Sequence, residues 1–135
     1  MKNIDEEGYV FIHDGARPML NADIIRRLQE VVTQDGTAVA GMPVKDTINI
    51  VDEASYIKSV PERKYVWQVQ TPQCFKRDVI LMCHKNALYD NFEATDDCMI
   101  AENYGVAVKL IEASTSNIKV TNYKDLAVTE VLLNV

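Results

Sequence analysis

Two short apolar runs with a helical segment between them constrain the fold of this chain more than any other feature. Residues 9–12 and 37–42 are continuous apolar runs, and residues 21–36 place apolar side chains at helical spacing. Asn21 is a suitable N-cap for this helix, and Gly36 is a suitable stop. A continuous apolar run predicts a strand buried on both faces, which is typical of a parallel sheet. We therefore expect a β-α-β unit with a right-handed crossover, which places the chain in the α/β class.

The rest of the chain continues the alternation of strands and helices. We expect strands over 65–69, ending at Thr71-Pro72-Gln73, and over 107–111, with a short strand or loop edge over 117–120. The absence of repeats and of Gly/Ser-rich linkers predicts a single domain over residues 1–135.

Three further helices are expected after the first. Thr95 is expected to cap a short helix that Gly105 ends, and Asn122 predicts a capping box for a last helix through Leu133. The helix over 76–88 should bury one apolar face, formed by Val79, Ile80, Cys83, Ala87 and Leu88.

Residues 45–67 follow a different pattern. Residues 47–51 and 56–60 alternate polar and apolar side chains around a turn at 52–55, which predicts a β-hairpin with one wettable face. An isolated hairpin is marginally stable in water. We therefore expect this segment to be an inserted arm that packs on a second copy of the chain.

Composition and charge exclude several classes of function. The chain has 135 residues and a net charge of −6, so its surface repels phosphate backbones and it is not expected to bind nucleic acid. No apolar run approaches the ~20 residues that span a bilayer, so no membrane partner is expected, and the N-terminus has no signal-peptide features. Three cysteines without metal-ligand spacing favour reduced thiols in a cytoplasmic protein.

Polar residues follow the strands or precede the helices at four places: Asp14 with Arg17, then Thr71, Thr95 and Lys119. Each alone has an ordinary explanation, as a surface ion pair, a helix cap or a solvated lysine. Together they predict a phosphate site, because guanidinium, ammonium and hydroxyl groups all donate to phosphate oxygens. Asp14 is the nearby carboxylate suited to Mg²⁺. His13 and His84 are expected to be structural.

Five strings occur in an order that resembles a known family: VFIHDGARPML, PVKDTI, TPQ-x-F preceded by Arg63, TDD, and NIKVT followed by DL. They resemble the sugar-phosphate cytidylyltransferases, and most closely those acting on 2-C-methyl-D-erythritol 4-phosphate. The resemblance runs from about Tyr9 to Leu133. It implies a Rossmann-like nucleotidyltransferase sheet, a homodimer joined through the 45–67 arm, and a need for Mg²⁺. It also implies transfer of CMP from CTP to methylerythritol phosphate, with release of pyrophosphate.

The resemblance also implies a role for each matching residue. Asp14, Arg17 and Lys119 would be catalytic, with Asp14 near the metal and Lys119 also on the substrate. The arm would lend its Thr and Arg to the neighbouring subunit. The residues implied to bind substrate are Thr47, Arg63, Thr71, Thr95 and Lys119.

One element of the family pattern has no match in this sequence. The family carries an N-terminal glycine-rich loop that cradles the CTP triphosphate, and this chain contains no such loop. We therefore expect the substrate half of the domain, without its N-terminal part, and no turnover of CTP by this chain alone. The alternatives are a relative that uses ribitol 5-phosphate, a non-catalytic dimerisation or regulatory fragment, and an α/β domain whose polar loop residues are only caps and turns.

Overall fold

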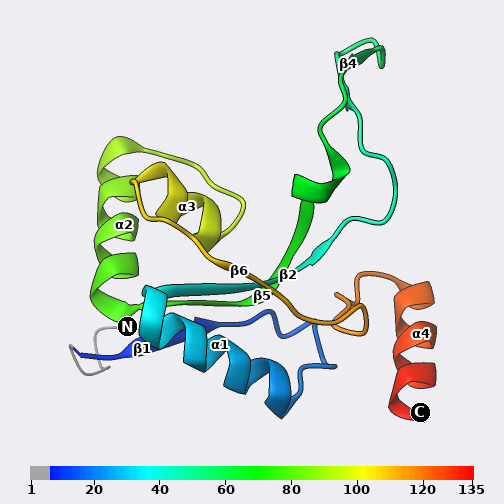
Figure 1. The fold of residues 1–135 in the computed structure, drawn as a ribbon, viewed down its shortest axis with the longest axis horizontal. Coiled ribbons are helices and arrows are strands. Elements are labelled where there is room, and N and C mark those ends of the chain that lie inside the picture. Colours follow the sequence, from blue (N-terminus) through cyan, green and yellow to red (C-terminus); the bar gives the residue numbers. More distant parts are fainter. Residues whose placement is uncertain (1–6) are drawn as a thin grey trace.

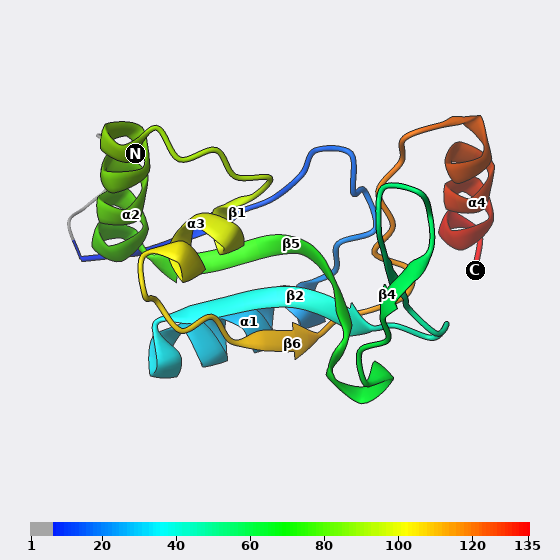
Figure 2. The same ribbon diagram turned by 90° about the horizontal axis from the view of Figure 1, so that it is seen from above.

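The fold is a four-stranded sheet with helices on both faces, seen in the computed structural model, which describes residues 7–135 (Figures 1 and 2). The sheet order is β1 (Tyr9–Ile12), β5 (Trp67–Lys76), β2 (Thr37–Pro43) and β6 (Leu110–Glu112). Strand β5 is antiparallel to both of its neighbours, whereas β2 and β6 are parallel. Strands β1 and β2 therefore run in the same direction with β5 between them, and the sheet is mixed instead of purely parallel.

The two faces of the sheet carry separate cores. Helix α1 (Ala22–Asp35) covers one face, and helices α2 (Arg77–Asp90) and α3 (Asp97–Asn103) cover the other. Neighbouring residues of one strand serve opposite cores, because successive side chains alternate across a sheet. In β2, Val39 faces α2 and α3, whereas Ala38 and Ala40 face α1.

The expected helix caps at both ends of the chain are confirmed. The Asn21 side chain accepts from the backbone N–H of Ile24, and Gly36 ends α1 with a φ of 82°, which favours glycine. Helix α4 (Tyr123–Leu133) begins with the predicted capping box between Asn122 and Asp125.

Strand expectations needed correction at several positions. Strand β1 is not buried on both faces: Val10 is buried, but Tyr9 and Phe11 are exposed because β1 lies at one edge of this sheet. Strand β5 does not end at Thr71 but continues through the cis Thr71–Pro72 bond to Lys76. Strand β6 begins at Leu110 instead of residue 107. Of the two alternatives expected for residues 117–120, a short strand or a loop edge, the structure has the loop.

Two helix expectations were also wrong in detail. Asp96, not Thr95, is the N-cap of α3, because its carboxylate accepts from the N–H of Met99. Leu88 lies on α2 but is exposed, whereas Ile80, Cys83 and Ala87 are buried as expected.

The arm, residues 45–67, extends away from the sheet (Figure 1). It contains the predicted hairpin, formed by β3 (Ile50–Val51) and β4 (Ile57–Ser59), followed by the 3-10 helix η1 (Arg63–Tyr65). The hairpin turn is held by Asp52, whose carboxylate accepts from the N–H groups of Ala54 and Tyr56.

Candidate functional site

Three segments far apart in the sequence meet beside the sheet: the loop after β1, the middle of β5 and the loop before α4. The Asp14 N–H donates to Thr71 Oγ1 over 3.0 Å, and Arg17 Nη1 donates to the carbonyl oxygen of Asn117 over 2.6 Å. The Val120 N–H donates to the carbonyl of Ala16 over 2.8 Å. Four of the five polar residues expected to form a phosphate site are thereby brought together from both ends of the chain: Asp14, Arg17, Thr71 and Lys119.

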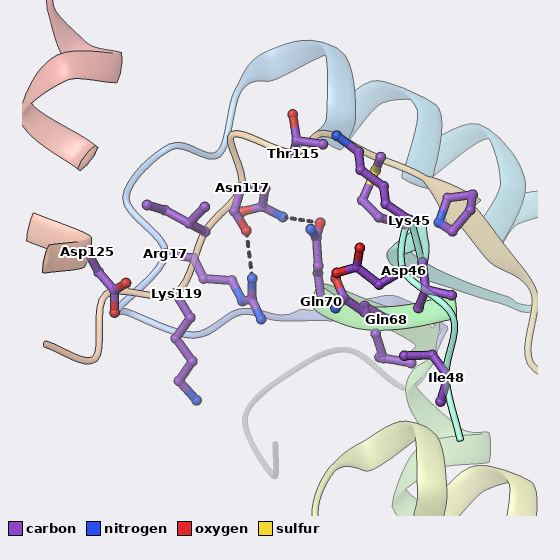
Figure 3. A pocket seen from close by; sticks show the side chains of 15 residues that line it. Arg17, Lys45, Asp46, Ile48, Gln68, Gln70, Thr115, Asn117, Lys119 and Asp125 are labelled. Carbon is purple, nitrogen blue, oxygen red and sulfur yellow. Dashed lines mark hydrogen bonds between the residues drawn. The ribbon is translucent and has the colours of Figure 1, made fainter. Parts of the chain in front are cut away.

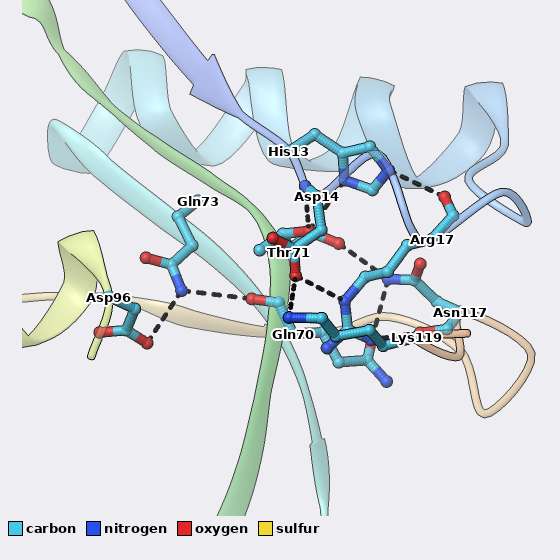
Figure 4. Close-up of polar contacts among 9 residues, drawn as sticks. All are labelled: His13, Asp14, Arg17, Gln70, Thr71, Gln73, Asp96, Asn117 and Lys119. Carbon is cyan, nitrogen blue, oxygen red and sulfur yellow. Dashed lines mark hydrogen bonds and ion pairs between the residues drawn. The ribbon is translucent and has the colours of Figure 1, made fainter. Parts of the chain in front are cut away.

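Two cations surround one carboxylate at this junction. Asp14 Oδ2 lies 3.3 Å from Lys119 Nζ and 3.6 Å from Arg17 Nε (Figure 4). The Arg17 side chain is only 12% exposed, against 49% for Lys119, so the guanidinium is held firmly while the ammonium reaches solvent. With two positive charges and one negative charge, the cluster is locally cationic on an acidic protein and suits an anion.

Asn117 is a site residue that the motif interpretation missed. It is completely buried, and its side-chain amide donates to Gln70 Oε1 over 3.0 Å and to the Thr71 carbonyl over 2.9 Å. Its own carbonyl orients Arg17. Asn117 is the first residue of the NIKVT string, and this position was the sequence feature that could have identified it as a site residue.

A cavity of about 740 Å³ opens beside these residues (Figure 3). Arg17, Gln70, Asn117 and Lys119 line one side, and residues at the base of the arm line another. Two buried polar atoms of this wall, Arg17 Nε and Asn117 Oδ1, have no hydrogen-bond partner among the described residues. Buried polar atoms are normally hydrogen-bonded, so these two atoms are exceptions beside the cavity.

Thr95 is not brought into contact with the cluster. It is exposed, and its hydroxyl lies 3.8 Å from Met99 Sδ. The adjacent Asp96 is tied to β5 instead, because buried Gln73 donates to its carboxylate over 3.1 Å. Gln73 also accepts from the Cys98 N–H over 2.8 Å, which fixes the start of α3 against the sheet.

The arm residues Thr47 and Arg63 also lie apart from the cluster within one chain. Both are exposed, and Arg63 Nη1 donates to the carbonyl of Lys45 over 2.9 Å. The arm residues that line the cavity are instead Lys45, Asp46 and Ile48, which flank Thr47.

The fit of the site to Mg²⁺ depends on Asp14. Within residues 7–135 no group of three or more His, Cys, Asp or Glu side chains is suited to a metal. Both ion pairs of Asp14 use Oδ2, so Oδ1 is the carboxylate oxygen outside them. Magnesium commonly binds through one or two carboxylates together with substrate phosphates and water, so a single carboxylate beside a phosphate site fits it.

The cysteines do not supply a nucleophile. Burial raises the pKa of Cys74 to about 12, and burial together with Asp96, Glu102 and Asp97 raises that of Cys98 to about 11. Burial also raises the pKa of Cys83. The thiolate is the reactive form, so these residues are structural. Among residues 7–135, no helix is long and apolar enough to cross a membrane.

Comparisons with known proteins agree with this geometry. The family model described as "IspD: 2-C-methyl-D-erythritol 4-phosphate cytidylyltransferase" matches residues 1–135. Enzymes of that name are similar at 43% identity in Caldanaerobacter subterraneus subsp. tengcongensis (92% of this chain, 55% of that protein) and at 44% in Clostridium novyi (96% and 56%).

Solved structures show the same fold. The 4-diphosphocytidyl-2C-methyl-D-erythritol synthase of Anaerococcus prevotii aligns with a TM-score of 0.91 at 29% identity, covering 99% of this chain and 63% of that one. The 2-C-methyl-D-erythritol 4-phosphate cytidylyltransferase of Thermus thermophilus aligns with a TM-score of 0.83 at 32% identity, covering 94% and 62%. The chain spans little more than half the length of the curated relatives it matches. Its sequence strings, its mixed sheet and its family match together show that it belongs to the 2-C-methyl-D-erythritol 4-phosphate cytidylyltransferase family.

Proposed function

We propose that this chain provides the polyol phosphate site of an enzyme that transfers CMP from CTP to 2-C-methyl-D-erythritol 4-phosphate and releases pyrophosphate. The observation that carries the proposal is the convergence of Arg17, Lys119 and Asp14 beside one cavity, in a chain that matches the family over its whole length. The names of the relatives favour methylerythritol phosphate over ribitol 5-phosphate.

The chemistry asks the protein mainly for position and charge. A phosphate oxygen of the polyol phosphate attacks the α-phosphorus of CTP, and the bond from that phosphorus to the pyrophosphate oxygen breaks. Two anions must approach each other, so neutralising and orienting groups lower the barrier. Arg17 presents a guanidinium held by the Asn117 carbonyl, and Lys119 presents an ammonium held beside Asp14.

Asp14 Oδ1 would hold Mg²⁺ together with ligand phosphates. When bound, the ion would supply further neutralisation of phosphate charge. The contribution of Asp14 itself is to hold Lys119 Nζ and Arg17 Nε at 3.3 and 3.6 Å.

We also propose that the chain forms a homodimer through its arm, and that it acts in the cytoplasm. Seven large apolar side chains of the arm are at least 36% exposed: Ile48, Ile50, Val51, Tyr56, Ile57, Val60 and Tyr65. A patch of this kind marks an interaction surface. In a dimer, exposed Thr47 and Arg63 would reach the cavity of the neighbouring subunit, and Thr95 is proposed as a further substrate contact.

Binding to the 135-residue chain tests the site. Titration calorimetry with methylerythritol phosphate should show binding that Arg17→Gln and Lys119→Gln each weaken by about tenfold or more, because each removes a charge-assisted hydrogen bond. Lys109→Gln is the matched control, since Lys109 is exposed and does not line this cavity. Equal losses in all three variants, or tighter binding of ribitol 5-phosphate, would contradict the assignment.

Turnover is tested in a chimera. The N-terminal segment of the Caldanaerobacter relative that precedes its aligned region is joined to this chain, and pyrophosphate release is measured with CTP, Mg²⁺ and methylerythritol phosphate. We expect turnover by the chimera, none by the 135-residue chain, and loss of turnover in the Arg17→Gln chimera. A folded chimera that binds both substrates but releases no pyrophosphate would refute the proposed reaction.

A further inference from the structure

His13 contacts the site through both of its ring nitrogens. Its Nε2 lies 3.0 Å from the carbonyl oxygen of Arg17, and its Nδ1 lies 2.9 Å from Thr71 Oγ1 (Figure 4). A carbonyl oxygen only accepts hydrogen bonds, so the ring nitrogen facing it, Nε2, carries a proton. In the neutral imidazole, Nδ1 is then an acceptor, and the Thr71 hydroxyl donates its proton to it.

The hydrogen-bonding capacity of Thr71 is therefore almost used. A hydroxyl has one proton to donate and two lone pairs that accept. The proton is directed to His13, and one lone pair accepts the Asp14 N–H over 3.0 Å. One lone pair is left for a ligand. Thr71 is partly exposed and follows Gln70, which lines the cavity.

We propose that His13 holds Thr71 as an acceptor, so that Thr71 binds a hydroxyl group of the polyol and not its phosphate. A phosphate dianion offers only lone pairs and has no proton for Thr71, whereas a polyol hydroxyl donates readily. Arg17 and Lys119 carry only donors and take the phosphate. His13 is then a positioning residue, and Thr71 determines specificity for the polyol. This inference rests on the proposed function.

Binding of two ligands to the 135-residue chain distinguishes the contact of Thr71 with a polyol hydroxyl from the contacts of Arg17 and Lys119 with phosphate. Methylerythritol phosphate uses both contacts, and inorganic phosphate uses only the cationic groups. Thr71→Val keeps the volume but removes the hydroxyl, so affinity for methylerythritol phosphate should fall about three- to tenfold while affinity for inorganic phosphate stays within about twofold. Thr71→Ser keeps a hydroxyl and should restore the affinity for methylerythritol phosphate relative to inorganic phosphate.

Substitutions of His13 test the positioning role. His13→Leu removes the acceptor for the Thr71 proton and should lower affinity for methylerythritol phosphate about three- to tenfold without weakening inorganic phosphate. His13→Asn offers an amide oxygen near the position of Nδ1 and should retain most of the preference. Nitrogen-15 NMR of the ring should show the proton on Nε2 and none on Nδ1.

The results of these experiments test the roles of Thr71 and His13 separately from the proposed function. Failure of the unsubstituted chain to bind methylerythritol phosphate refutes the proposed function. Normal binding that Thr71→Val leaves unchanged, or that it weakens equally for both ligands, overturns the role of Thr71. A protonated Nδ1 in the NMR spectrum overturns the role of His13 even if the substitutions impair folding.

Discussion

Three side-chain amides organise the polar interior around the site. Asn117 donates to Gln70 and to the Thr71 carbonyl, and Gln73 joins the start of α3 to β5 (Figure 4). Removing one partner leaves a buried polar group of this kind without its hydrogen bond, which destabilises the fold. The amides therefore hold their neighbours in one arrangement. The orientation of the Arg17 guanidinium depends on this arrangement, because the carbonyl oxygen that accepts its hydrogen bond belongs to Asn117.

Cys98 provides a prediction at the same scale. Its pKa is raised to about 11, which means that the thiolate forms only as pH rises toward that value. At mildly alkaline pH the thiolate fraction should be roughly a hundredfold below that of an ordinary cysteine, whose pKa is 9.0. Alkylation by iodoacetamide, followed by mass spectrometry, should be slow in the folded chain and fast in urea. Equal rates in both conditions would show that the thiol is not protected.

At the scale of elements, β2 and β5 form the pairing on which the sheet depends. Their register shifts between Val39 and Gly41, and at Gly41 an added Cβ would lie 2.9 Å from the Gln68 carbonyl oxygen. The close approach needs glycine because the obstructing atom is backbone and not a flexible side chain.

Gly41→Ala should therefore destabilise the chain by about 1–3 kcal/mol, because the two strands must separate to admit the methyl group. Urea denaturation followed by circular dichroism measures the effect. Gly15→Ala is the control, since a Cβ there meets nothing within 4 Å and its unfolding free energy should change by no more than about 0.5 kcal/mol. A Gly41→Ala midpoint equal to that of the control would contradict the close packing.

Helix α4 depends on its cap more than on packing, because among its residues only Thr129 is buried. The Asp125 carboxylate accepts from the N–H and the hydroxyl of Thr121 and from the N–H of Asn122. These bonds to the charged form lower its pKa below the ordinary 3.8.

A lowered pKa in the folded state makes the cap stabilising above pH 3.8, and this stabilisation is lost as pH falls through the folded value. Hydrogen exchange of the α4 amides, relative to those of α1, should therefore accelerate below pH 3.8. Asp125→Asn should remove this pH dependence and leave α4 less protected throughout. The same profile in both proteins would exclude a role for the carboxylate.

For the whole molecule, the arm is the segment least supported by its own chain. Within residues 7–135 the strands β3 and β4 pair only with each other, and the apolar side chains of the arm stay exposed. Helix α4 likewise stands beside the sheet without covering it (Figure 2). In the proposed dimer, a second copy of the chain would cover this exposed apolar surface.

Ile57→Asp, in β4, should weaken self-association by about tenfold or more, because burying an unpaired charge in an apolar interface is costly. Light scattering during gel filtration, over a range of concentrations, measures the change. Met82→Asp is the matched control on α2, where the side chain is also exposed. A monomeric unsubstituted chain at micromolar concentration, or an equal effect of the control, would contradict the arm as the dimer contact.

The sequence was sufficient for features that are local along the chain. The caps at Asn21 and Asn122, the stop at Gly36 and the hairpin turn at 52–55 all followed from residue type and spacing over a few positions. Helix and strand periodicity depends on the same short range, so α1, α2 and α4 were predicted to within a few residues. The ordered strings also indicated the family resemblance, because the order of motifs along the chain can be read without knowing which residues are in contact.

Only the tertiary structure decided what those elements touch. The antiparallel placement of β5 between β1 and β2, the alternating exposure of β1 and the separation of Thr95 from Arg17 depend on contacts across the sheet. The hydrogen bond from Arg17 to Asn117 joins residues 100 positions apart, and that of Asp14 to Thr71 joins residues 57 apart. No local spacing specifies such pairs, because their geometry comes from the packing of both sheet faces around β5.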